Sequence, residues 1–317
     1  MMMREKKIAV TIGDPAGIGP EVALKAILSN DVAGLCRPVI IGDRVVVEEV
    51  VKRFELPVSP GHIELVNIGE IADKGFEKGR PTAAGGRASV AYIRRAVELA
   101  LNKSVDAVVT APISKESLKI AGFNWPGHTE MLAEFTCTKE FAMVFYSDKL
   151  RLILVTIHTA LANVPAMITR DRVFKTVILA QKACAVLGIE RPRIAVAGLN
   201  PHAGESGIFG TEERDAIAPA VEDARQCGVP VSGPYPPDVI FHRAYKGEFD
   251  LIVCMYHDQG LIPLKMIAFD KGVNFTVGLP IIRTSPDHGT AYDIAWKGVA
   301  NPSSMIEAIR LSVRMRR

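Results

Sequence analysis

Three histidines follow apolar stretches with the length and composition of buried strands. His158 ends the segment RLILVTIH, His202 ends RIAVAGLNPH, and His257 ends DLIVCMYH. In open α/β sheets the carboxyl ends of the strands line the ligand crevice. Three neutral imidazoles that meet there would bind a divalent cation and leave positions open for a substrate. The pattern therefore predicts a metal site, formed within one chain or completed across a dimer interface.

Two acidic residues and a lysine accompany the histidines. Asp258 directly follows His257, and Asp238 ends the motif YPPD. Either carboxylate could be a further ligand, orient an imidazole or carry a proton. Lys265 is a third candidate for the general base, which stays open among these three residues. The imidazoles admit zinc, cobalt or nickel, and the carboxylates leave magnesium or manganese possible.

Three hydrogen-bond donors follow at even intervals in the same part of the chain. Lys265, Asn274 and Arg283 are spaced nine residues apart, between segments of buried character. An ammonium, an amide and a guanidinium together suit an anionic ligand that is rich in oxygen atoms. The spacing predicts recognition of a phosphate or a carboxylate. A solvated surface residue is the alternative for each of the two basic side chains.

Strand and helix signals alternate along the first part of the chain, which indicates βα units on a largely parallel sheet. Strands are expected at residues 8–12, 38–42, 63–66 and 105–110. Farther along, residues 147–149 separate two apolar runs as a hairpin turn would, so the second sheet is expected to be mixed. The Pro-rich residues 232–237 are expected to form a turn.

The length of 317 residues corresponds to about two domains of roughly 150 residues each. We expect a first α/β domain at residues 1–127 plus 300–317, because the last helix returns to it. The second α/β domain is expected at residues 128–299 and carries the three histidines.

The segment GDPAGIGPE, residues 13–21, joins the first expected strand to the first helix. A glycine turn before a helix can hold an anion on backbone N–H groups. The segment matches neither the G-x-G-x-x-G nor the Walker pattern. A structural turn is therefore the favoured interpretation.

Composition argues against several classes of protein. The net charge of +3 is small and the basic residues are dispersed, which argues against nucleic acid binding. No apolar run approaches the ~18 residues of a membrane span. The five cysteines lack CxxC spacing and fit a reducing compartment. We expect a cytoplasmic protein that acts on a small molecule.

Several blocks of the chain resemble the 4-hydroxythreonine-4-phosphate dehydrogenases of pyridoxal phosphate synthesis, a family with threonate- and erythronate-4-phosphate dehydrogenase relatives. The blocks cover nearly the whole length and are TIGDPAGIGPE, GHTEML, HTAL, GLNPHAGESGIFGTEE, YPPD, YHDQGLIPLK and RTSPDHGTAYDIA. The resemblance implies a homodimer with the active site between the domains and the dimer interface in the second. It implies a divalent metal, shared between subunits and bound by His158, His202 and His257. It also implies that five side chains contact the substrate: His128, Thr129, Lys265, Asn274 and Arg283.

The segment HGTAYDIAWKGVANP, residues 288–302, is similar to the cofactor loop of isocitrate and isopropylmalate dehydrogenases. This similarity implies a two-domain fold of their type, with mixed sheets. It also implies that NAD or NADP binds without a Rossmann fingerprint. His288 and Asn301 would lie against the adenine, with Asp293 nearby.

Pro286, Tyr292 and Trp296 stand where the family's pattern has smaller or aliphatic residues. A tryptophan beside the cofactor loop alters the shape of the pocket, so the choice between NAD and NADP stays open. The implied reaction is the metal-dependent, NAD(P)-linked oxidative decarboxylation of 4-phosphooxy-L-threonine to 3-amino-2-oxopropyl phosphate. The alternatives are oxidation of threonate or erythronate 4-phosphate and, in another class, a metal-dependent phosphohydrolase. A phosphohydrolase would leave residues 288–301 without a task.

Overall fold

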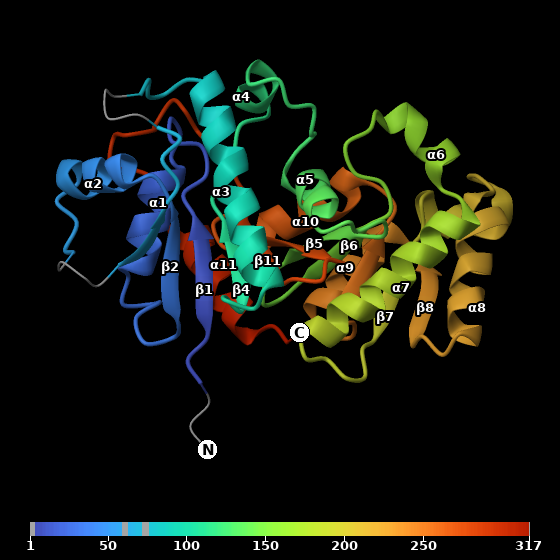
Figure 1. Ribbon diagram of the computed structural model, residues 1–317. Helices are drawn as coiled ribbons and strands as arrows, with labels where there is room; N and C mark the ends of the chain where they lie inside the picture. Colours follow the sequence, from blue (N-terminus) through green and yellow to red (C-terminus); the bar gives the residue numbers. More distant parts are fainter. Residues whose placement is uncertain (1–3, 59–62, 72–75, 317) are drawn as a thin grey trace. The chain divides into compact units, whose positions relative to one another are not determined.

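The computed structural model describes residues 4–58, 63–71 and 76–316. Its contacts divide the chain into two compact units (Figure 1). Unit 1 comprises Met1–Lys139 and Leu279–Met315, and unit 2 comprises Glu140–Gly278 together with Arg316. Helices pack on a sheet in each unit, so the predicted α/β class is confirmed.

The unit boundaries fall at other positions than the expected 127/128 and 299/300. Helix α5 (His128–Phe135) packs against α3 (Ala83–Leu101) in unit 1. Strand β11 (Arg283–Pro286) pairs in parallel with β4 (Ala107–Thr110) of the same unit. Tertiary pairing therefore decides which unit these elements join, and local sequence does not reveal it.

Unit 1 is built on a parallel sheet with strand order β3-β2-β1-β4-β11. Its strands also include β1 (Lys7–Thr11), β2 (Arg37–Gly42) and β3 (Glu64–Asn67). Strands β1 and β4 are almost entirely buried, as expected for parallel strands covered on both faces. The predicted βα rhythm is confirmed, and β11 is a strand that the sequence pattern did not reveal.

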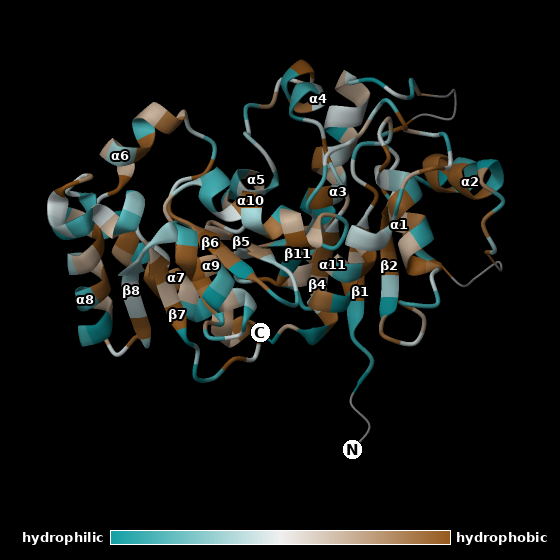
Figure 2. Ribbon diagram, turned by 180° about the vertical axis from the view of Figure 1, so that it is seen from behind, coloured by the Kyte–Doolittle hydropathy of each residue, from teal (hydrophilic) through white to brown (hydrophobic). Residues whose placement is uncertain are grey.

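Helices cover both faces of the unit 1 sheet: α3 lies over one face and α11 (Ser303–Arg314) over the other (Figures 1 and 2). Helix α3 begins after Thr82, whose hydroxyl accepts the Gly85 N–H at 2.9 Å and so caps the helix. Deeper in α3, the buried Tyr92 hydroxyl donates to Asp43 Oδ2 at 2.7 Å. The remaining helices are α1 (Gly19–Ile27), α2 (Arg44–Arg53) and α4 (Lys115–Ile120).

Unit 2 contains a mixed sheet with strand order β10-β5-β6-β9-β7-β8. The predicted hairpin is confirmed, because β5 and β6 are antiparallel and residues 147–149 lie in the turn between them. Strand β5 is also antiparallel to β10, whereas β6, β9, β7 and β8 run parallel. The bounds are β5 (Ala142–Tyr146), β6 (Arg151–Leu154), β7 (Ile194–Ala197), β8 (Val231–Tyr235), β9 (Leu251–Cys254) and β10 (Val273–Val277).

The core of unit 2 follows from the alternation of side chains along its strands. Leu152 and Leu154 of β6 and Ile252 of β9 face Ile240 and Leu264, which come from helices α9 (Pro237–Tyr245) and α10 (His257–Ala268). Helix α7 covers the other face (Figure 1), and apolar residues concentrate on the strands (Figure 2). The further helices are α6 (Val164–Met167), α7 (Arg170–Val186) and α8 (Ala218–Gln226).

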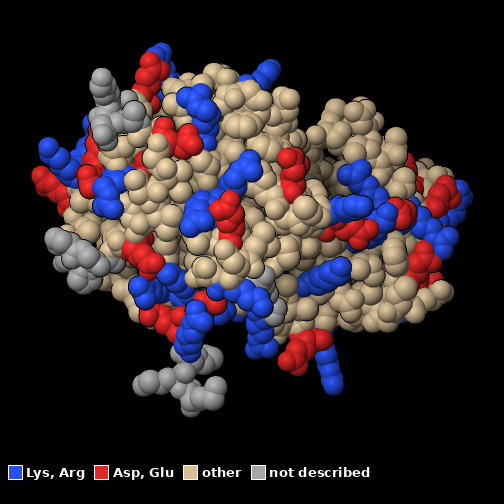
Figure 3. Space-filling view, viewed as in Figure 1, with Lys and Arg blue, Asp and Glu red and all other residues tan. Residues whose placement is uncertain are grey.

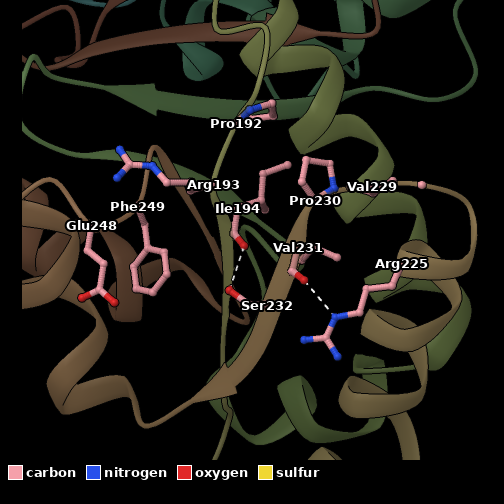
Figure 4. A pocket seen from close by; sticks show the side chains of 11 residues that line it. Pro192, Arg193, Ile194, Arg225, Val229, Pro230, Val231, Ser232, Glu248 and Phe249 are labelled. Atoms are coloured by element: carbon pink, nitrogen blue, oxygen red, sulfur yellow. Dashed lines mark hydrogen bonds between the residues drawn. The ribbon is translucent and has the colours of Figure 1, made fainter.

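The expected turn at residues 232–237 is wrong, because β8 occupies most of it as the outer strand beside β7. Two prolines, Pro230 and Pro234, precede and interrupt this strand, and they favoured the turn in the sequence. Proline is tolerated on an outer strand because one side of that strand needs no ladder donor. Arg225 closes over β8 and donates to the Val231 carbonyl at 3.0 Å (Figure 4).

Charged side chains of both signs are interspersed on the face shown in Figure 3. Many of them form ion pairs, including Arg193 with Asp250 and Arg170 with Asp223. None of the helices in the described ranges combines the length and the apolar character that crossing a bilayer requires.

Candidate functional site

The three strands that precede the predicted metal ligands are neighbours in the unit 2 sheet. Strand β9 lies between β6 and β7 and is parallel to both. His158, His202 and His257 each follow the carboxyl end of one of these strands. The three histidines therefore follow strands that end at the same edge of the sheet, which is the edge where open α/β sheets bind ligands.

His158 and His257 face the same space. Their ring centroids are 5.9 Å apart. Both line a cavity of about 570 Å³, together with Thr159, Tyr256 and Asp258. Metal–nitrogen bonds of about 2 Å allow two imidazole centroids to lie up to roughly 6.5 Å apart around one cation. The separation of these two rings is therefore compatible with a shared divalent ion.

Asp258 acts on one of these rings directly. Its Oδ1 lies 2.7 Å from Nδ1 of His257, the first residue of α10. A carboxylate on one ring nitrogen fixes the orientation of the imidazole and leaves Nε2 for a ligand bond. In the same helix, Gln259 accepts the Met255 N–H and donates to the Gly198 carbonyl, both at 2.7 Å. The start of α10 is thereby tied to the end of β7.

His202 does not join the pair within one chain. Its ring lies 6.0 Å from that of Phe209, and its side chain is exposed. Across the ranges that the structure describes, no three His, Cys, Asp or Glu side chains are grouped as a metal would require. Two of the three predicted ligands therefore come together in the single chain, and the third is presented outward.

The backbone around His202 is strained. Four non-glycine residues between 202 and 206 have φ between 41° and 58°, and Gly204 between them has φ of 81°. A left-handed conformation costs roughly 1–2 kcal/mol for each non-glycine residue and is rarely repeated. Strain of this kind persists only where the surrounding structure enforces it, and it is concentrated at functional sites.

Glu213 is the residue that holds this loop. Its carboxylate is buried and accepts the N–H groups of Leu199 and Asn200, both at 2.7 Å. The other oxygen accepts the Asn200 amide at 2.9 Å. A side chain at Gly204 would place its Cβ 2.7 Å from that same oxygen. The loop is therefore wrapped tightly around one carboxylate.

Unit 1 brings together two nitrogen-bearing side chains, the buried Arg283 and the half-buried His128. Arg283 lies on β11, and its Nη2 and Nε lie 2.7 and 3.1 Å from the Thr110 hydroxyl. Burial lowers the pKa of Arg283 to about 9, although Glu130 opposes the shift. Burial, and next the neighbouring Arg283, hold the pKa of His128 well below its usual value. His128 is therefore neutral at pH 7 beside a guanidinium cation.

An unpaired atom completes this arrangement. Nε2 of His128 is buried and has no hydrogen-bond partner among the described residues, and the adjacent Thr129 is also buried. Native proteins rarely leave such atoms unpaired without a functional reason. A buried cation beside an unpaired imidazole nitrogen suits an oxyanion ligand.

The other predicted substrate residues belong to unit 2. Asn274 is buried on β10, and its Oδ1 has no partner among the residues that the structure describes. Lys265 lies on α10, with its Nζ 5.8 Å from the centre of the Phe269 ring. Asp238, one of the candidate bases, is exposed in the first turn of α9.

Residues 288–301 connect β11 to α11 and contain the predicted cofactor contacts. The side chains of His288, Asp293 and Asn301 are exposed. Asn301 Oδ1 also accepts the N–H of Ser303 at 3.0 Å and its hydroxyl at 2.7 Å, at the start of α11. Trp296, by contrast, is buried.

Comparison with known proteins identifies the family. The model of the family described as "Pyridoxal phosphate biosynthetic protein PdxA" matches residues 34–312. The chain belongs to the PdxA family. The resemblance inferred from the sequence blocks is therefore confirmed.

PdxA relatives carry two different names. The chain is 46% identical to a 4-hydroxythreonine-4-phosphate dehydrogenase of Desulforapulum autotrophicum, over 96% of this chain and 94% of the relative. It is 44% identical to a D-threonate 4-phosphate dehydrogenase of Salmonella typhimurium, over 99% of this chain and all of the relative. A crystal structure of 4-hydroxythreonine-4-phosphate dehydrogenase from Klebsiella pneumoniae superposes with a TM-score of 0.92, at 42% identity and 99% coverage of each chain.

Sequence reasoning missed residues that shape the site of this PdxA chain. Thr110 contacts Arg283, but a threonine at the end of a strand carries no distinguishing signal. Glu213 holds the His202 loop, and its only signal was its position after a glycine-rich stretch. Asp14 lies in the recognised glycine turn and has partners that are distant in sequence.

Proposed function

We propose that the chain catalyses the NAD(P)-linked oxidative decarboxylation of 4-phosphooxy-L-threonine, yielding 3-amino-2-oxopropyl phosphate for pyridoxal 5'-phosphate synthesis. The observation that carries the proposal is the His158–His257 pair at adjacent strand ends, in a PdxA chain related at 46% identity to a dehydrogenase of that name. The pair suits a divalent cation, and the substrate offers a hydroxyl group and two anionic ends to the chain's polar residues.

We infer that His202 completes the metal site across a homodimer. Each predicted ligand has exposed apolar residues close to it in the sequence: Leu161 near His158, Ile208 near His202, and Met266 on the helix that starts at His257. These three apolar side chains are 67%, 73% and 82% exposed. Large exposed apolar side chains are typical of association surfaces. A second copy of the chain would cover them and bring the missing imidazole.

The cation and the nicotinamide supply the chemistry that side chains lack. A bound divalent ion, whether zinc, magnesium, cobalt or another, would supply Lewis-acid chemistry toward substrate oxygen atoms, and bound NAD or NADP would supply a hydride acceptor. Asp238, Asp258 or Lys265 accepts the hydroxyl proton. The carboxylate then leaves as carbon dioxide, and a proton replaces it on carbon.

The remaining predicted residues hold the substrate in position. Arg283 provides a planar cation for a phosphate or carboxylate, and the neutral His128 provides a polar atom without a charge. Thr129, Lys265 and Asn274 add further hydrogen bonds. Fixed orientation of the reacting carbon is worth several powers of ten in rate. On the cofactor side, the exposed His288, Asp293 and Asn301 form the contact surface.

D-Threonate or D-erythronate 4-phosphate is the second candidate substrate, because a relative that is 44% identical is named D-threonate 4-phosphate dehydrogenase. These acids carry a hydroxyl group where 4-phosphooxy-L-threonine carries an amino group. The amine is cationic, so a carboxylate near that carbon favours the amino acid and a donor favours the hydroxy acid.

The test measures nicotinamide reduction by the metal-loaded protein with each phosphorylated acid and each nucleotide. We expect reduction that is lost with His257→Ala and highest with 4-phosphooxy-L-threonine. A higher kcat/KM with threonate or erythronate 4-phosphate would assign the other substrate. Release of inorganic phosphate without reduction would replace the proposal with a phosphohydrolase, and no reaction at all would refute it.

A further inference from the structure

The glycine turn at residues 13–21 contains a buried carboxylate without an assigned role. Asp14 is fully buried, and its Oδ1 accepts the Ala16 N–H at 2.9 Å. Its Oδ2 accepts two hydroxyl groups at 2.7 Å each, from Ser117 and from Tyr292. Tyr292 belongs to residues 288–301, at the other end of the sequence. The carboxylate therefore joins the first turn of the chain to the predicted cofactor loop.

The rest of the turn contacts the same loop with its backbone. The N–H of Ile18 donates to the Thr290 carbonyl at 2.9 Å. The Pro15 carbonyl accepts the indole N–H of Trp296 at 3.0 Å. A Cβ at Gly17 would come within 2.9 Å of the Thr290 carbonyl oxygen, so only glycine allows this approach. The turn is therefore fitted to the loop and is not open to an anion at Ile18.

Helix α1 continues the contact along the loop. Glu21 accepts the Ala300 N–H at 2.9 Å, and Lys25 donates to the Gly298 carbonyl at 2.8 Å. Both side chains also pair with each other at 2.7 Å. Bonds from residues 14–25 thus reach the loop at positions between 290 and 300.

Aromatic packing fixes the middle of the loop. Trp296 lies 5.4 Å from Phe76 and 6.4 Å from Phe54, measured between ring centroids. The Lys78 ammonium lies 4.5 Å from the Trp296 ring, and Arg53 donates to the Trp296 carbonyl at 2.9 Å. The inner face of the loop is therefore held, while His288 and Asp293 remain exposed on the other.

We propose that residues 13–21 are the positioning platform of the cofactor loop, with the Asp14–Tyr292 hydrogen bond as its central contact. The inference rests on the proposed function, because it assumes that residues 288–301 bind the nicotinamide nucleotide. A loop that is already ordered loses less conformational entropy when the nucleotide binds. Asp14 and Tyr292 are positioning residues, and they act on affinity through the shape of the loop.

The chemistry of Tyr292 agrees with a fixed donor. Burial is the main cause that raises its pKa to about 12, so the phenol keeps its proton at any working pH. Tyr292→Phe removes the hydroxyl and retains the ring. The hydrogen bond to a buried carboxylate is lost, and the loop is held less firmly near residue 292 while its other contacts remain.

The experiment compares nucleotide binding in two matched variants. Tyr292→Phe is paired with Tyr92→Phe, which removes a tyrosine–aspartate bond of the same 2.7 Å length, but to Asp43 and without a partner in residues 288–301 for that bond. Calorimetry with NAD and with NADP measures affinity, and both variants are also unfolded by denaturant. A Trp125→Phe background leaves Trp296 as the only tryptophan, so its emission reports the loop without any ligand.

We expect Tyr292→Phe to weaken nucleotide binding roughly tenfold, the scale of one lost hydrogen bond to a charged group. The substrate KM should stay within about twofold, and Trp296 emission should shift. Tyr92→Phe should lower stability and leave affinity and emission unchanged. Wild-type affinity and emission in Tyr292→Phe, or an equal loss of affinity in Tyr92→Phe, would overturn the platform. Failure of the wild-type protein itself to bind either nucleotide would instead refute the cofactor assignment in the proposed function.

Discussion

Two irregular loops, residues 198–213 in unit 2 and residues 288–301 in unit 1, carry predicted ligand-binding side chains, and they are held in different ways. The first is fixed by Glu213, a neighbour in sequence, and it stores strain in successive left-handed residues. The second is fixed by Asp14, Ile18 and Lys25, which lie more than 260 positions away along the chain.

The difference fits the two kinds of ligand. The ligand atom of a metal-binding side chain must be positioned to within a fraction of an ångström. A strained loop held by a single anchor residue can fix that position. A dinucleotide covers a long surface, and many contacts spread along a loop give it a stable shape. We therefore expect a single substitution to cause a large loss of metal binding at the first loop. At the second loop, a single substitution should cause a smaller loss of nucleotide binding.

The largest effect is expected when His202 is replaced by glycine. Removing a metal ligand should lower turnover by more than the 10–100-fold that is typical of residues that only orient ligands. Because glycine accepts a positive φ without penalty, the unfolding free energy should rise by about 1 kcal/mol. Steady-state kinetics and denaturant unfolding measure the two quantities. His202→Ala is the control, with the same loss of turnover and no gain in stability; retained turnover in both variants would remove His202 from the metal site.

Glu213→Gln should produce the second largest effect. The amide oxygen can still accept the N–H groups of Leu199 and Asn200, but its NH₂ group then faces the Asn200 amide as donor against donor. We expect metal affinity to fall 10–100-fold and stability to fall by about 2 kcal/mol. Competition with a chelating dye measures the affinity. Glu212 also accepts a hydrogen bond from the Asn200 amide, but it is less buried. The control Glu212→Gln should therefore lower metal affinity and stability less than Glu213→Gln. Equal losses in both variants would contradict the anchor role of Glu213.

The smallest expected effect is a pH dependence of kcat/KM that arises beside residues 288–301 and not at residues 198–213. The pKa of Arg283, just before residues 288–301, is lowered to about 9 by burial. In the folded, ligand-free protein Arg283 loses its proton at a lower pH than in the unfolded chain. Its contribution to the free energy of unfolding therefore increases as the pH rises above about 9. Anion binding needs the charged form, so kcat/KM for the phosphorylated substrate should fall by up to about tenfold for each further pH unit. Metal affinity at residues 198–213 should not follow this profile.

Arg283→Ala provides the control for the pH profile. Its kcat/KM should be low at all pH values, without the decline that begins near pH 9. The same decline in the variant would assign the titration to another group. The profiles are recorded at constant ionic strength, because salt screens attraction to an anionic substrate.

Much of the architecture could be predicted from local patterns. The βα rhythm of unit 1 and the hairpin at residues 147–149 are visible as apolar periods and turn residues. The placement of three histidines at the carboxyl ends of strands also follows from the sequence, whereas the adjacency of these strands is known only from the sheet pairing. The pairing of His158 with His257 agrees with that expectation.

What could not be predicted depends on partners distant in the sequence. Strand β8 contains Pro234 and directly follows Pro230, so it looked like a turn; only its outer position in the sheet makes proline acceptable there. Thr110 gains its importance from Arg283, and Asp14 from Tyr292, contacts that no local pattern records. The expected assignment of elements to the two units differs from the structure for the same reason, since β11 joins unit 1 by pairing with β4.

The outer strand β8 has a consequence for the behaviour of the protein at high concentration. An uncovered strand edge can recruit strands of other molecules and start fibril growth. Pro230 and Pro234 supply no N–H group, and Arg225 already occupies the carbonyl of Val231. This side of the unit 2 sheet therefore makes a poor template for cross-β assembly, so the protein should tolerate high concentration without polymerising along it.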